Sequence, residues 1–99
     1  MSELEDRLAA LAAAGQTIPY GALARDLGWR MGDLTKALEL LMETDARAGA
    51  PLRASLCEAR LGNGLPARGF LEKAAALGFD VSDPSAFVAL HRRRLSGAG

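Results

Sequence analysis

Leucine and alanine recur every three or four residues along most of this chain, and this spacing limits its possible folds more than any other feature. The sequence holds 20 Ala and 17 Leu but only one Ile and two Val. Small and straight-chain apolar residues favour helices, whereas β-branched residues favour strands. The length of 99 residues suits one small hydrophobic core. We therefore expect a single domain over residues 1–99 that is mainly α-helical with a small β element.

Capping residues and glycines mark the ends of the expected helices. Ser2 followed by Glu5 has the form of a capping box, and Gly15 ends the first periodic stretch. Asp83 followed by Pro84 is a typical start for a last helix over 84–95. Residues 96–99 are expected to be a frayed tail. The sequence thus predicts about five helices: one from Ser2 to Gly15, then 21–27, 31–48, 67–78 and 84–95.

The hydrophobic period changes from 3.6 to two after Pro51. In residues 52–58, apolar side chains alternate with Arg53, Ser55 and Cys57, which predicts a strand. The following segment, 60–66, is rich in Gly, Asn and Pro and is expected to be an exposed loop. Residues 16–20 contain Pro19, so they add at most a short edge strand.

Residues 20–28, YGALARDLG, look like the first helix of a helix-turn-helix motif, where a small Ala and a closing Gly let two helices cross closely. With the segments that follow, residues 16–70 resemble the winged helix-turn-helix proteins. Helical spacing at 69–73, where a second wing strand is usual, leaves open whether the wing is a strand pair or a loop. The recognition helix, wing strand and wing loop would be residues 31–42, 52–58 and 60–68.

The formal net charge of zero hides an uneven distribution of charge. Residues 1–50 carry five Lys and Arg against eight Asp and Glu, which gives −3. Residues 51–99 carry seven against four, which gives +3. Phosphate contacts with Lys and Arg supply most non-specific affinity for nucleic acid. The basic half contains the expected wing, so the charge pattern permits DNA binding without requiring it.

The resemblance implies binding of duplex DNA, with a role in transcription regulation. Three residues of the expected recognition helix or its start would approach the groove, and three in the wing region would contact the backbone. Asp33, Glu39, Glu43 and Asp45 lie on the same helix, so DNA binding requires these carboxylates to face away from the phosphates. The candidate residues are Arg30, Thr35 and Lys36 for the groove, and Arg53, Arg60 and Arg68 for the backbone.

A second interpretation keeps this fold but makes it a protein-protein interaction module without DNA binding. The acidic helix 31–48 or the basic wing would then contact a partner chain. A homodimer is also open, through the first or the last helix. Acids lying between Lys36, Arg60 and Arg68 would favour protein contact, and a continuous positive surface would favour DNA.

Ile18-Pro19-Tyr20-Gly21 also resembles the winged-helix part of DNA-repair alkyltransferases. That family places its reactive cysteine in a Pro-Cys-His-Arg sequence, but Cys57 lies between Leu56 and Glu58. A neighbouring carboxylate raises the pKa of a thiol, so we expect no enzyme. The sequence indicates no cofactor, no metal site and no small-molecule substrate. An acidic start and short apolar runs predict a cytoplasmic protein without a membrane segment.

Overall fold

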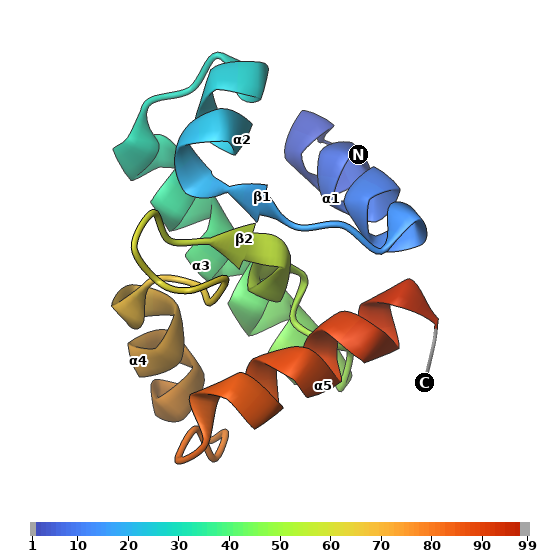
Figure 1. The fold of residues 1–99 in the computed structure, drawn as a ribbon, viewed down its shortest axis with the longest axis vertical. Coiled ribbons are helices and arrows are strands. Elements are labelled where there is room, and N and C mark those ends of the chain that lie inside the picture. The colour runs from blue at the N-terminus through green and yellow to red at the C-terminus, as the bar shows by residue number, and fades with distance from the viewer. Residues whose placement is uncertain (1, 98–99) are drawn as a thin grey trace.

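The computed structural model describes residues 2–97, in which the helices surround a two-stranded sheet (Figure 1). This confirms the mainly helical fold with a small β element. Ser96 still belongs to the last helix and Gly97 caps it, while residues 98–99 of the expected tail lie outside the described residues. The elements are α1 (Glu3–Ala14), β1 (Ile18–Pro19), α2 (Tyr20–Leu27), α3 (Met31–Ala48), the 3-10 helix η1 (Arg53–Leu56), β2 (Cys57–Glu58), α4 (Arg68–Ala76) and α5 (Pro84–Ser96).

The predicted caps at Ser2, Asp83 and Gly28 are confirmed, whereas α2 starts one residue before the predicted 21–27 and α4 covers 68–76 rather than 67–78. Ser2 Oγ accepts a hydrogen bond from the backbone N–H of Glu5 at 3.1 Å, and the Asp83 carboxylate accepts one from Ala86 at 3.2 Å. Both bonds satisfy a backbone donor that the first helical turn leaves free. Gly28 ends α2 with φ 70°, a conformation that glycine adopts without strain. This turn brings α3 back against α2.

The expected strand over 52–58 is wrong. Residues 53–56 form the 3-10 helix η1, and within 52–58 only Cys57 and Glu58 form a strand. The alternation predicted one polar face, but Ser55 and Cys57 are as fully buried as Leu52. The cause is the position of η1, which contacts α1, α3 and α5, so that of its residues only Arg53 is partly exposed.

The sheet consists of β1 and β2, which pair in parallel with Ile18 opposite Cys57 and Pro19 opposite Glu58. Thr17 strengthens this junction, because its hydroxyl donates a hydrogen bond to the Glu58 carboxylate. From the other side, Arg92 of α5 donates from Nε to the carbonyl oxygen of Ser55 at 2.7 Å. The sheet thus joins the start of α2 to the core segment around η1.

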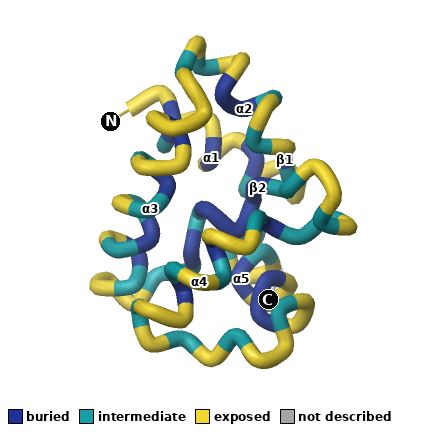
Figure 2. The backbone as a smooth tube through the Cα atoms, turned by 90° about the vertical axis from the view of Figure 1, so that its left-hand side faces the viewer, coloured by how far each residue is buried: buried dark blue, intermediate teal, exposed yellow. Residues whose placement is uncertain are grey.

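Figure 2 shows that buried and exposed stretches alternate along α3. Its buried side faces the core through Leu34, Leu38 and Met42. Helix α5 covers the core on another side with Phe87 and Val88. The opposite side of α3 faces water, and one edge of α3 borders the groove described next. None of the helices within residues 2–97 combines the length and the apolar character that a membrane span requires.

Candidate functional site

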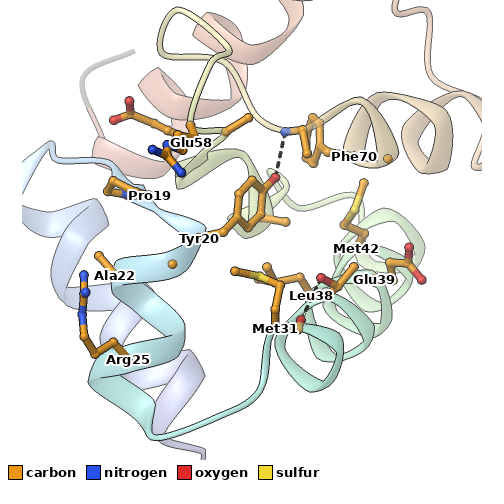
Figure 3. A pocket seen from close by; sticks show the side chains of 17 residues that line it. Pro19, Tyr20, Ala22, Arg25, Met31, Leu38, Glu39, Met42, Glu58 and Phe70 are labelled. Atoms are coloured by element: carbon orange, nitrogen blue, oxygen red, sulfur yellow. Dashed lines mark hydrogen bonds between the residues drawn. The ribbon is translucent and has the colours of Figure 1, made fainter.

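A groove of about 870 Å³ lies between α2, α3 and the start of α4, beside the loop that follows β2 (Figure 3). Its inner surface is mainly apolar. Leu38 and Met42 point into it from α3, and Phe70 points into it from α4. These three side chains are buried, whereas Met31 at the start of α3 is 46% exposed. The groove is therefore an open site with an apolar floor.

Tyr20 crosses the inner end of the groove and fixes one of its walls. Its hydroxyl oxygen accepts a hydrogen bond from the backbone N–H of Ala67 at 3.0 Å, as Figure 3 shows. Burial raises the pKa of Tyr20 to about 12, so the hydroxyl stays protonated at neutral pH. This bond joins α2 to the residue that precedes α4. It ties together two residues that line the groove.

The rim of the groove carries charged and polar side chains. Arg25 of α2, Thr35 of α3 and Arg60 of the loop are exposed, and all three line the groove. Glu39 and Glu58 also line it and are half-buried. The Glu58 carboxylate already accepts the Thr17 hydroxyl hydrogen bond. Within residues 2–97, neither Arg25 nor Arg60 belongs to an ion pair.

The structure brings together only two of the six predicted site residues. Thr35 and Arg60 both line the groove. Arg30 precedes α3, and Lys36 lies on α3; both are exposed but neither lines the groove. Arg68 is exposed at the start of α4, where its Nε lies 3.3 Å from the Glu72 carboxylate. These three remain accessible to a ligand that extends beyond the groove.

Arg53 holds the fold together, so its expected contact with a DNA backbone is not supported. Its guanidinium Nη2 lies 2.8 Å from Asp45 Oδ1, and its Nη1 lies 3.2 Å from Glu5 Oε2. The backbone N–H of Arg53 also donates to Asp45 at 3.0 Å. Binding a phosphate would require Arg53 to give up these partners, so we leave it out of the proposed interface.

The four acids of α3 do not share one face. Asp45 points into the core and is 4% exposed. Glu43 accepts a hydrogen bond from Lys73 Nζ at 2.6 Å, and this bond lowers the pKa of Glu43. Asp33 is exposed in the first turn, and Glu39 alone among the four lines the groove. Two of the four carboxylates are therefore already engaged by cations.

Sequence reasoning missed Arg25 and Tyr20. The turn at Gly28 predicted where α2 ends, but the side of α2 that faces the groove depends on where α4 packs. A signal for Tyr20 was present in the sequence, because an aromatic residue directly before the predicted helix 21–27 and beside Pro19 is placed to contact a neighbouring element. For Arg25 the local sequence gives no comparable signal.

The thiol of Cys57 is shielded from water. The side chain is fully buried, and burial raises its pKa to about 12. The thiol is therefore protonated at neutral pH, whereas the thiolate is the nucleophilic form. His91, the single histidine of the chain, accepts a hydrogen bond from the backbone of Leu52. In residues 2–97 no three His, Cys, Asp or Glu side chains are close enough to share a metal ion.

Comparison of the chain with protein-family models, with curated proteins and with solved structures found no match.

Proposed function

We propose that this protein binds duplex DNA without catalysing a reaction, and that the groove side of the molecule faces the duplex. In this proposal α2 and α3 are the two helices of a winged helix-turn-helix motif. The wing is a loop, residues 59–67, rather than a strand pair. Thr35 approaches the bases, and Arg25 and Arg60, which both line the groove, contact phosphates.

The observation that carries the proposal is an apolar floor beside two exposed arginines, Arg25 and Arg60, that form no ion pair within residues 2–97. Arginines outside any ion pair are well suited to phosphates, because each can neutralise one backbone charge. The floor offers the rings of Tyr20 and Phe70 together with Met42. Nucleobases lifted out of a stack bind in such pockets, between aromatic and apolar side chains. A groove of about 870 Å³ has room for one nucleotide.

Glu39 and Glu58 on the same groove favour a second candidate, a protein-interaction module. Carboxylates near phosphates repel them, whereas a protein partner can supply lysine or arginine to match. Salt dependence and substitution of the rim arginines separate the two candidates, because only a polyanion releases many counterions when it binds.

The test is a fluorescence-anisotropy titration of a labelled 20-base-pair duplex at low salt. We expect the double variant Arg25→Ala/Arg60→Ala to weaken binding at least about tenfold and to lower the slope of log K against log salt by about two. Arg47→Ala/Arg93→Ala is the matched control, because it removes two exposed arginines that do not line the groove. This control should retain binding within about twofold.

Two results would contradict the proposal. The first is no binding of the unchanged protein to any duplex at low salt. The second is an equal loss of affinity in the two double variants, which would show attraction by overall charge alone.

A further inference from the structure

Leu61 stands almost entirely in water. Its exposed fraction is 92%, compared with 58% for Leu40, 46% for Met31 and 44% for Leu90. An apolar side chain so completely exposed contributes nothing to the core. The whole side chain is therefore accessible to a ligand.

The backbone that carries Leu61 is fixed by its own hydrogen bonds. The N–H of Ala59 donates to the Leu65 carbonyl at 2.8 Å, and the N–H of Leu65 donates to Gly62 at 2.9 Å. The N–H of Gly62 in turn donates to Ala59 at 3.2 Å. A Cβ on Gly62 would lie 2.7 Å from the Leu65 carbonyl oxygen, so this turn is closed too tightly for a larger residue. The loop thus presents Leu61 on a defined support.

The position of Leu61 relates it to the groove. The two residues before it, Ala59 and Arg60, both line the groove. Arg60 is exposed and outside any ion pair within residues 2–97. An apolar tip therefore stands directly beside a cation that can hold a phosphate.

We propose that Leu61 is a wedge that inserts between neighbouring base pairs of the duplex bound at the groove. This inference rests on the proposed function and names one residue that deforms the DNA. Proteins that kink DNA commonly insert a single apolar side chain at a base step, while nearby arginines hold the backbone. A rigid turn suits this role, because the wedge must not fold back when it meets the stack. A base unstacked by the wedge would lie next to the apolar floor of the groove.

The surroundings of Leu61 favour a base step over a lipid or a protein surface. Its neighbours along the chain, Arg60, Gly62, Asn63 and Gly64, add no large apolar side chain at the tip of the loop. Protein and membrane contacts use contiguous apolar patches. A single leucine next to an arginine is typical of side chains that insert at a base step.

The experiment uses the whole protein and a duplex that contains 2-aminopurine, a base analogue whose fluorescence rises when it is unstacked. We expect the unchanged protein to raise this fluorescence at a preferred position. Leu61→Ala should abolish the rise and weaken binding about tenfold. Leu61→Met should retain both, because it keeps an apolar side chain of similar volume. Leu40→Ala, an exposed leucine that does not line the groove, is the control and should change neither.

The outcomes separate this inference from the function on which it rests. If Leu61→Ala binds the duplex as tightly as the unchanged protein, with the same fluorescence rise, the wedge is wrong while DNA binding stands. If the unchanged protein binds no duplex, both are wrong. The wedge would also be wrong if the unchanged protein bound lipid vesicles in place of DNA through Leu61. In that case the unchanged protein would co-sediment with vesicles, and Leu61→Ala would not.

Discussion

The region around η1 and the region around the groove use their polar side chains in opposite ways. Near η1, Asp45 is 4% exposed and Arg53 gives it three donor groups, while His91 accepts a hydrogen bond from Leu52. At the groove, Arg25 and Arg60 are exposed and form no ion pair within the described chain. Charges that hold the fold are paired inside it, whereas charges at the groove remain available to a ligand. Substitutions should therefore affect stability on one side and binding on the other.

Among the polar side chains, the largest loss of stability is expected from Asp45→Ala. The change leaves the Arg53 guanidinium and its backbone N–H without their principal acceptor, at a position that is mostly buried. Arg53 then keeps only the more exposed Glu5 as a partner, and we expect the loss of the buried acceptor to cost about 3 kcal/mol. Urea denaturation should show this decrease in the free energy of unfolding.

The control is Asp26→Ala, which breaks the ion pair between Arg7 and Asp26. Both side chains of this pair are more than 40% exposed, at 44% and 45%. Exposed pairs contribute less than about 1 kcal/mol. Equal losses in the two variants would contradict the distinction between a paired interior and an open surface.

A smaller effect is expected from the protonation of His91. Its Nδ1 accepts a hydrogen bond from the backbone N–H of Leu52 at 2.9 Å. Protonation would place a hydrogen on Nδ1, so that it would face the Leu52 N–H as a second donor and the bond would be lost. Desolvation by burial, helped by the charge of Arg94, lowers the pKa of His91 below 6.5. A lowered pKa means that the unfolded chain takes up the proton first. Stability is then fully present above pH 6.5 and decreases as the pH falls through the lower pKa of the folded state.

His91→Phe is the variant that tests this pH dependence. It keeps an aromatic ring against Phe79 and Phe87 but removes the acceptor, so it should lose about 1–3 kcal/mol at pH 8. Because the chain has a single histidine, the variant should show no decrease in unfolding free energy between pH 7 and 5.5. An equal decrease in unfolding free energy in the unchanged protein and in His91→Phe would show that another group titrates.

The sequence predicted the helices well because local signals specify their ends. Capping side chains at Ser2 and Asp83 and the left-handed glycine at Gly28 act within a few residues, so no knowledge of the tertiary fold is needed. The error at 52–58 has the opposite origin. An alternating pattern shows which side chains are apolar, but only the packing of α1, α3 and α5 around the segment explains why Ser55 and Cys57 are also buried.

The candidate site was predicted less well, because it depends on contacts between distant residues. Arg53 finds Asp45 eight residues away and Glu5 48 residues away. One signal was available, since Asp45 continues the helical stripe of Leu34, Leu38 and Met42 and a carboxylate there needs a buried partner. The packing of α4 decides which face of α3 borders the groove, and no local sequence pattern predicts where α4 packs.

The smallest effect on stability is expected from Met31→Ala at the groove. Met31 is 46% exposed, and its backbone carbonyl still accepts the Thr35 hydroxyl hydrogen bond after the substitution. The unfolding free energy should change by no more than about 0.5 kcal/mol. Met42→Ala is the matched control, because Met42 lines the same groove from the same helix but is 1% exposed, and its loss should cost about 2–5 kcal/mol.

If the groove binds a nucleotide, Met31→Ala should weaken duplex binding while leaving the urea midpoint unchanged. A large loss of stability in Met31→Ala would mean that this wall of the groove belongs to the core. Residues of α3 would then serve both stability and binding, which would contradict the contrast between the two regions.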